Sequence, residues 1–334
     1  MPRRTAPALG LAILAIGVGT GSAGTRLLFF EFQAVGGYST AAKEIVAYSI
    51  AQPEAMQKPS LGFDLVQRFS GKSGDVAILA VEGRIAWNAQ PQEEGLRTFD
   101  PQLYNAYLRL KLGFADCWVG HDKPRLGLAL PLDNHAELLQ PLSMYGYGFD
   151  RDWGFGLDRD TAWGGVGVSL TAGSGMALRL KNTYLAAARI SRGVLSQDNY
   201  SLGFSLAYGR VQDVMGNTLL SDAVVDLKLA SLDFSWVRNN WENRFEMLGG
   251  SRDGLGEFVL FWRTGIGLFG ENRLKLEAQP ILKLTRESTS FELGLGATSL
   301  LSADWTLRAM TIYNTEAKDL RFVLQVYFYK NTRL

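Results

Sequence analysis

The last strand-like stretch, residues 320–329, constrains the fold more than any other part of the sequence. Leucine, phenylalanine or valine occupies every second position from Leu320 to Phe328, while Arg321 and Gln325 fall between them. Successive side chains of a strand point to opposite faces, so one face of this strand is a continuous apolar stripe. That stripe must lie against a protein core or a lipid bilayer, and its length matches the roughly ten residues of a tilted transmembrane strand.

Composition excludes several other classes of protein. The chain has 334 residues, of which 47% are hydrophobic and 20% are charged, so it is too apolar for a disordered tail protein. Its formal charge of +1 does not indicate a nucleic-acid binder. The single cysteine, Cys117, excludes an intramolecular disulfide and a thiolate metal cluster, and we expect neither a cofactor nor a metal.

The N-terminus has the features of a secretory signal peptide. Arg3 and Arg4 precede an apolar segment at residues 6–18, and small residues at 21–23 offer a cleavage site. The apolar segment is shorter than the roughly 20 residues that a transmembrane helix needs. We therefore predict a signal peptide at residues 1–23 and a mature domain at residues 24–334.

The alternating pattern recurs through the mature chain. It is clearest at residues 104–114, where Ala106, Leu108 and Leu110 share one face and Arg109 and Lys111 share the other. About fifteen such segments are predicted, at residues 27–35, 61–69, 75–88, 104–114, 117–121, 163–171, 176–186, 200–208, 224–237, 241–249, 257–265, 272–286, 290–299, 305–313 and 320–329. Most connections between them are short, which indicates antiparallel neighbours without crossover helices.

Two segments depart from this regularity. Within residues 224–237 the apolar parity changes between Leu229 and Leu232, and a β-bulge or a turn would account for the change. Residues 122–162 show no sustained period and contain three prolines, so we predict a long loop there.

An array of this length must hide its open edges, and closing into a barrel achieves this. A soluble sandwich is the alternative, whereas a solenoid would show a fixed repeat, which is not present. The signal peptide and the strand length favour lipid, as do aromatic residues near the predicted strand ends: Trp87, Tyr104, Tyr200, Tyr208, Trp236, Trp241, Trp305 and Tyr313. We predict an all-β fold, a transmembrane antiparallel up-and-down β-barrel of 14–16 strands, in the outer membrane of a Gram-negative-type cell. The first and last strands should pair to close it.

The arrangement of amphipathic hairpins behind a signal peptide resembles the outer-membrane porins. Within that class, residues 119–128, VGHDKPRLGL, resemble a segment of phosphate-selective and related substrate-specific porins. The resemblance implies a channel for small hydrophilic solutes. The chain departs from the usual terminal aromatic residue of such barrels, because it continues for five residues beyond Tyr329.

Parity places many charged side chains on the inner face of the predicted barrel, with a modest excess of cations. The basic pore-lining candidates are Arg84, Arg109, Lys111, Arg179, Lys181, Arg244, Arg273, Lys275, Arg308 and Arg321. Rings of arginine and lysine in a pore favour anions, so an anion preference is one selectivity this channel could have. Alternatively, these side chains pair with internal carboxylates and fill a narrow barrel.

The long loop carries a second set of candidates. Should it fold into the lumen, it would form a constriction with Asp150, Arg151, Asp152, Asp158, Arg159 and Asp160. An ordinary surface loop is the alternative. The acidic run lacks the regular ligand spacing of a calcium loop.

Catalysis is not indicated by the sequence. Only His121 and His135 could act as bases, and no nucleophile motif accompanies them, so we expect no enzyme and no catalytic residue. The leading hypothesis is a porin-like diffusion channel. The alternative is a non-conducting barrel that serves as an adhesion or assembly scaffold or as a sheath for a partner protein. Expected partners are outer-membrane lipid, the barrel-assembly machinery, small hydrophilic solutes and further copies of the chain, but no nucleic acid.

Overall fold

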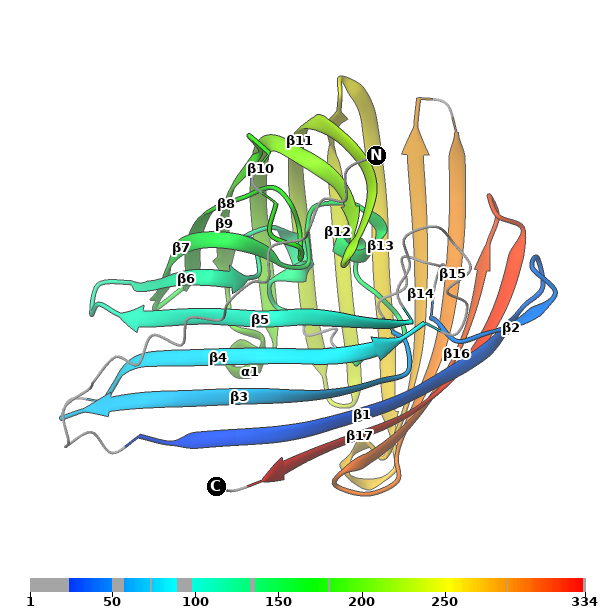
Figure 1. Ribbon diagram of the computed structural model, residues 1–334, viewed down its shortest axis with the longest axis horizontal. Coiled ribbons are helices and arrows are strands. Elements are labelled where there is room, and N and C mark those ends of the chain that lie inside the picture. Colours follow the sequence, from blue (N-terminus) through cyan, green and yellow to red (C-terminus); the bar gives the residue numbers. More distant parts are fainter. Residues whose placement is uncertain are drawn as a thin grey trace, which may run out of the picture.

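The computed structural model describes residues 24–49, 57–72, 74–88, 98–132, 136–179, 181–286 and 288–332. The predicted signal peptide and His135 lie outside these ranges. Within them, seventeen strands form one sheet that closes on itself, and every pairing is antiparallel. Figure 1 shows the closure, with β1 in blue beside β17 in red.

The elements follow one another with few interruptions. The strands are β1 (Arg26–Ser39), β2 (Glu44–Val46), β3 (Ser60–Gly71), β4 (Gly74–Trp87), β5 (Phe99–Lys111), β6 (Asp116–Asp122), β7 (Asp152–Thr161), β8 (Gly164–Thr171), β9 (Tyr184–Arg192), β10 (Tyr200–Met215), β11 (Thr218–Arg238), β12 (Trp241–Arg252), β13 (Leu255–Leu268), β14 (Leu274–Thr285), β15 (Thr289–Leu300), β16 (Trp305–Asn314) and β17 (Asp319–Thr332). The helices are short: η1 (Gly127–Ala129), η2 (Leu142–Tyr145), α1 (Leu195–Asp198) and η3 (Gly270–Asn272). No helix in the described ranges is long and apolar enough to cross a membrane.

The short strand β2 pairs with the same edge of β1 as β3 does, so the two strands together occupy one position in the barrel wall. Residues Arg26 to Gln33 of β1 pair with β3, and Gly37 to Ser39 pair with β2. Among the described residues, the closed wall therefore has sixteen strands, within the predicted range.

The prediction for the closing strand is confirmed. Strand β17 pairs with β1 in a register that places Phe32 opposite Phe328 and Ala34 opposite Val326. Leu324 is 60% exposed on the outer face, whereas its neighbour Gln325 is fully buried on the inner face. The apolar stripe therefore faces outward, as a strand in contact with lipid requires.

The barrel has two distinct ends. The start of β1 and the end of β17 lie at the end where neighbouring strands are joined by tight turns such as residues 112–115 and 239–240, which we call the turn end. The longer connections, including residues 123–151 and 172–183, leave from the opposite end, which we call the loop end. Exposed aromatic side chains mark both levels of the outer surface: Trp163, Trp241 and Trp305 toward the turn end, and Trp87, Tyr208 and Tyr313 toward the loop end.

Tyr104 is an exception to the predicted aromatic positions. It is 1% exposed and lies inside the barrel, where the Arg84 guanidinium is 4.7 Å from its ring centroid. The register of β4 and β5 shifts beside it, between Glu82 and Gly83. Tyr104 is the extra residue at this shift, and the bulge turns its side chain to the inner face, which the sequence pattern did not reveal.

The parity change in β11 has a different cause from the predicted bulge. Leu227 and Leu229 point inward, are 1% and 3% exposed, and belong to a buried apolar cluster. Leu232 follows on the outer face without any break in register. The irregularity of this hairpin lies nearer its tip, opposite Gln212 to Val214. The predicted bulge or turn between Leu229 and Leu232 was wrong. The apolar parity changes because Leu227 and Leu229 belong to an apolar part of the inner wall, whereas Leu232 faces outward.

Two predicted boundaries also differ from the structure. The stretch at residues 176–183 alternates like a strand, but β9 begins at Tyr184, because the Asp152 carboxylate accepts hydrogen bonds from the backbone of Gly173 and Ser174 and holds this segment as a loop. The long loop ends at residue 151 rather than 162, since β7 begins at Asp152. Glycines at the inner positions of β7 obscure its alternation, although Phe155 and Leu157 are exposed on the outer face.

Candidate functional site

The connection between β6 and β7, residues 123–151, folds into the barrel, and we call it the lumen loop. Most of its described apolar side chains are buried, many of them against the inner faces of distant strands. A loop of this length inside a compact domain is usually functional. The sequence left open whether this loop enters the lumen or lies on the surface, and the structure places it in the lumen.

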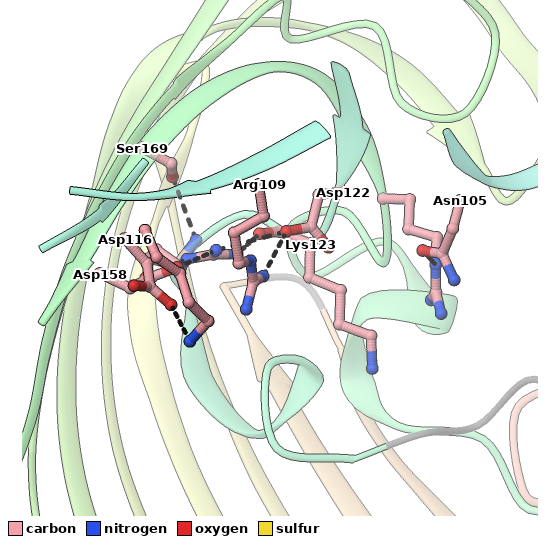
Figure 2. A network of polar contacts seen from close by, with 10 residues as sticks. Asn105, Arg109, Asp116, Asp122, Lys123, Asp158 and Ser169 are labelled. Atoms are coloured by element: carbon pink, nitrogen blue, oxygen red, sulfur yellow. Dashed lines mark hydrogen bonds and ion pairs between the residues drawn. The ribbon is translucent and has the colours of Figure 1, made fainter. Parts of the chain in front are cut away.

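Arg125 fixes the root of the lumen loop. Its guanidinium donates to Asp158 at 2.7 Å and to Asp122 at 3.3 Å, and it lies 4.8 Å from the centroid of the Trp118 ring. Its backbone N–H donates to the Ser169 hydroxyl at 3.1 Å. Figure 2 shows Asp122, Asp158 and Ser169 of this network, with Arg109 reaching the same Asp122. Because Arg125 is only 1% exposed, its pairing with two carboxylates and an aromatic face is needed to offset the cost of burying its charge.

Two segments of the lumen loop, residues 126–132 and 142–149, pack on the wall from β9 to β14. The loop side chains of this cluster are Leu126, Leu128, Leu132, Leu142, Tyr147 and Phe149, and the wall contributes Leu185, Leu227, Leu229, Leu248, Val259, Phe261 and Ile281, among others. Each fully buried leucine or phenylalanine stabilises a fold by about 1.5–3 kcal/mol. Five such side chains, together with Tyr147, are enough to keep these two segments docked.

Polar contacts position the same segment. The Gly127 N–H donates to the Ser205 hydroxyl of β10 at 3.0 Å. On the wall beside it, the Ser231 hydroxyl donates to the Glu246 carboxylate at 2.6 Å and holds that carboxylate in place. A Cβ atom at Gly127 would lie 1.9 Å from Glu246 Oε1, and the φ of Gly127 is +52°. Glycine is therefore required at the point where the loop meets this wall.

The middle of the lumen loop, residues 137–139, packs on the strands beside the seam between β1 and β17. Leu138 and Leu139 are buried with Val35 of β1, Met310 and Ile312 of β16 and Val323 of β17. The Arg263 guanidinium donates to Gln279 at 2.7 Å, to the Glu137 carboxylate and to the Leu139 carbonyl. The loop thus contacts walls formed by residues far apart in the sequence.

Tyr145, at the end of η2, holds the segment of the lumen loop that returns toward β7. The Tyr145 hydroxyl donates to the Glu292 carboxylate at 2.5 Å, and the Lys283 ammonium lies 4.7 Å from the Tyr145 ring centroid. Burial, and then the neighbouring Glu292 charge, raise the pKa of Tyr145 well above its usual value. The phenol therefore stays protonated and keeps donating at neutral pH.

Seven of the ten basic pore-lining candidates lie on the inner face of strands: Arg84, Arg109, Lys111, Arg244, Lys275, Arg308 and Arg321. Four of them pair with carboxylates on the same or adjacent strands at 2.6–3.2 Å: Lys111 with Asp116, Arg244 with Glu242, Lys275 with Glu242 and Glu277, and Arg321 with Asp319. Arg109 pairs with Asp122 at 3.2 Å. Carboxylates therefore offset much of the positive charge.

Neutral side chains contact the other two. Arg84 is 3% exposed and donates to the Gln102 amide oxygen at 2.7 Å. Arg308 donates to Gln325 at 3.0 Å and lies 5.0 Å from the Tyr327 ring centroid. Gln325 in turn donates to Gln33 at 2.7 Å, so this chain of contacts crosses the closing seam.

The other three basic candidates lie outside the strands. Arg179 and Lys181 belong to the loop before β9, where Lys181 pairs with the exposed Asp222 at 2.7 Å. Arg273 follows η3 in the turn before β14 and is exposed. The prediction that Arg179 and Lys181 lie on the inner face of a strand is therefore wrong, because Asp152 anchors this segment as a loop.

The six constriction-loop candidates are divided between the lumen loop and β7. Asp150 and Arg151 end the loop as a buried ion pair, and Arg151 donates to Asn105 at 3.0 Å. Asp152, Asp158, Arg159 and Asp160 lie in β7. Asp152 is buried and anchors the loop before β9, Asp158 pairs with Arg125, and Arg159 and Asp160 are exposed toward the turn end.

Several residues that hold the lumen loop were not among the candidates. They are Arg125, Arg189, Asp233, Glu246 and Arg263. Arg263 and Glu246 have inner-face parity and could have been found from the alternation. Arg189 lies beyond the predicted end of its strand, and Arg125 lies in a segment without periodicity.

A cavity of 530 Å³ opens beside the root of the lumen loop. Its charged lining consists of Arg109, Lys111, Asp116, Arg125, Asp158, Arg159, Asp160 and Arg189. Residues 113–116 of the β5–β6 turn also line it, so it lies toward the turn end. It is the place where charges from the wall and the loop meet beside open space.

Metal ligation and histidine chemistry have little support in the described part of the chain. Among those residues, no group of three or more histidine, cysteine, aspartate and glutamate side chains could hold a metal ion. His121 is fully buried, with its ring centroid 5.0 Å from that of Trp153.

The sequence matches no protein-family model and no curated protein. Solved structures are similar in fold. An anion-selective porin from Comamonas acidovorans is 12% identical, with a TM-score of 0.61 over 92% of this chain and 100% of that one. OmpT, an outer membrane protein of Vibrio cholerae in a trimer form, is 11% identical, with a TM-score of 0.65 over 92% and 99%. OmpF of Salmonella typhi is 8% identical, with a TM-score of 0.66 over 91% and 97%. The chain therefore has the β-barrel fold of the outer-membrane porins.

Proposed function

We propose that the protein is an outer-membrane channel for the passive diffusion of small hydrophilic solutes, exported by its signal peptide and catalysing no reaction. The 530 Å³ charged cavity at the root of the lumen loop carries this proposal. A loop that only filled the barrel would have no need of charged side chains around an open space. The fold shared with outer-membrane porins supports the same function.

Anion preference is the selectivity that the cavity favours. Five cationic side chains and three carboxylates line it. A charged cleft with low-dielectric walls concentrates ions of the opposite sign. Because Arg109 and Lys111 each pair with a carboxylate at 3.2 Å, the preference should be modest.

Single-channel conductance of the purified protein in a planar lipid bilayer tests the proposal. A diffusion channel gives stepwise, ohmic current in potassium chloride. A folded, heat-modifiable barrel without current would contradict it and would favour the alternative of an adhesion or assembly scaffold or a sheath for a partner protein.

Selectivity is tested by the reversal potential in a salt gradient. Replacing Arg109 and Lys111 together by glutamate should move the reversal potential toward cations, because four units of charge change around the cavity. The matched control is Arg273→Glu, since Arg273 is exposed in a turn and does not line the cavity. An unchanged reversal potential in the double variant would remove both residues from the permeation path.

The proposal includes the partners that an outer-membrane barrel requires. These are outer-membrane lipid and the barrel-assembly machinery, and further copies of the chain are a third. The trimer form of the OmpT structure supports a homo-oligomer. The mass of the protein in mild detergent, measured by light scattering, tests this part separately.

A further inference from the structure

A shallow apolar groove lies on the outside of the barrel, over β8 to β12. Its volume is 700 Å³, and its lining includes Ala186, Ala188 and Ala230 between the larger Leu206 and Tyr208. These side chains have outward parity in β9, β10 and β11. The alanines form a floor that the neighbouring larger side chains border.

One lysine lines this groove at the level of the aromatic residues near the loop end. Lys228 has outward parity in β11, is exposed, and lies opposite Tyr208 in the β10–β11 register. The Tyr208 ring also contacts that of Tyr184 in β9, with centroids 6.2 Å apart. Paired aromatic rings of this kind mark the boundary between hydrocarbon and headgroups.

The charge of Lys228 has no partner within the described residues, where no ion pair or hydrogen bond joins its ammonium to another group. The adjacent register pair differs in this respect, since Arg210 and Asp226 approach to 3.6 Å. A lysine that faces lipid is unfavourable unless it reaches the interface, where an anionic headgroup can compensate it.

We propose that this groove binds one phosphorylated lipid from the leaflet at the loop end of the barrel. An acyl chain lies along Ala186, Ala188 and Ala230, and the lipid phosphate accepts hydrogen bonds from the Lys228 ammonium. Charge complementarity selects this occupant. An apolar surface of a second copy would leave the lysine charge buried without a partner, which is costly.

Native mass spectrometry of the protein in detergent, with added bisphosphorylated lipid A, tests the proposal. Wild type should retain the lipid, and Lys228→Gln should reduce the bound fraction about fivefold, because one interfacial lysine contributes on that scale. Ala230→Leu should also reduce it, by filling the floor. Heat modifiability establishes that each variant is folded.

The matched control is Lys330→Gln. Lys330 also has outward parity and is exposed, but it lies at the turn end and away from the groove. This variant should bind lipid A as wild type does. Phosphatidylcholine should not distinguish Lys228→Gln from wild type, because the charges of its phosphate and its quaternary ammonium cancel and the selection depends on net negative charge. Equal lipid A retention by Lys228→Gln and wild type would overturn the proposal. Displacement of the bound lipid A by free inorganic phosphate, with no contribution from the acyl chain, would also overturn it. A dimer that forms through this face would overturn it as well. Lys228 has outward parity and does not line the charged cavity, so this test is independent of the proposed function.

Discussion

The ion pair between Arg189 and Asp233 passes over Gly203, a residue of the strand that separates them. Arg189 lies in β9 and Asp233 in β11, and Arg189 Nη2 is 2.8 Å from Asp233 Oδ1. A Cβ atom at Gly203 would lie 2.1 Å from the same Nη2 atom. Arg189 also donates to the Ser205 hydroxyl, at 3.3 Å, which accepts the Gly127 N–H of the lumen loop. A missing side chain in the wall therefore supports the position of the loop.

Replacing Gly203 by alanine should destabilise the barrel. The added methyl group displaces the Arg189 guanidinium from a buried ion pair, and overpacking of this kind costs about 1–3 kcal/mol. The urea midpoint of unfolding in lipid vesicles measures the change. Gly36→Ala is the control, because no heavy atom lies within 4 Å of its added Cβ position. Equal midpoints for the two variants would contradict this account.

Removing a single carboxylate at the cavity should strengthen anion preference. Asp116 pairs with the Lys111 ammonium at 3.2 Å, and both side chains are partly exposed, so Asp116→Asn leaves the fold intact while freeing one positive charge. The reversal potential in a potassium chloride gradient should move toward chloride, and Lys111→Gln should move it the other way. Variants that move it in the same direction would show that the cavity charge does not act on the permeant ion.

Leu229 and Leu232 test the assignment of inner and outer faces in β11. Leu229 is buried against the lumen loop, while Leu232 is 40% exposed on the outer surface, midway between the aromatic levels at Trp236 and Tyr208. Leu232→Arg should destabilise insertion by about 2–4 kcal/mol, as a lipid-facing charge at mid-depth does. Leu229→Arg should instead release the loop, and limited proteolysis within residues 123–151 should detect it. The assignment fails if the two variants exchange these effects.

The raised pKa of Tyr145 predicts how docking of the lumen loop depends on pH. Its pKa in the folded protein is raised well above the usual value by burial and then by the Glu292 charge. The folded state therefore keeps a proton that an unfolded tyrosine releases near pH 10, so the stabilisation is complete below about pH 10 and is lost as the pH rises further.

Ultraviolet titration of wild type against Tyr145→Phe measures this effect. The difference spectrum should show no tyrosinate band from Tyr145 at about pH 10. At neutral pH the phenylalanine variant should lose about 1.5–3 kcal/mol of loop stability, as expected for a hydrogen bond to a charged group. A Tyr145 titration midpoint near the ordinary tyrosine value would contradict the burial argument.

Most of the barrel wall could be predicted from alternation alone. The period of two is a local property of a strand, so the inner and outer faces of residues 320–328 followed directly from the order of side chains. The prediction failed where a tertiary contact overrides the local pattern. Asp152 holds residues 172–183 as a loop, and glycines on the inner face of β7 conceal its alternation.

The candidate site could be predicted only in part. Arg109 and Lys111 followed from strand parity, and both line the cavity. Arg125 lies in a segment without period, and its partners Asp122 and Asp158 are 3 and 33 residues away along the chain. No local pattern can show that a chain segment returns to pair with a residue so distant.

The closing strand and the lumen loop show what each level of structure decided. The sequence by itself determined a membrane-type strand whose apolar stripe faces outward, because alternation and length are properties of the strand itself. Only the tertiary structure decided that Leu227 and Leu229 face inward and that the loop spans the lumen. Those positions depend on an apolar surface that six side chains of a distant loop complete, and such complementarity exists only after the barrel has closed.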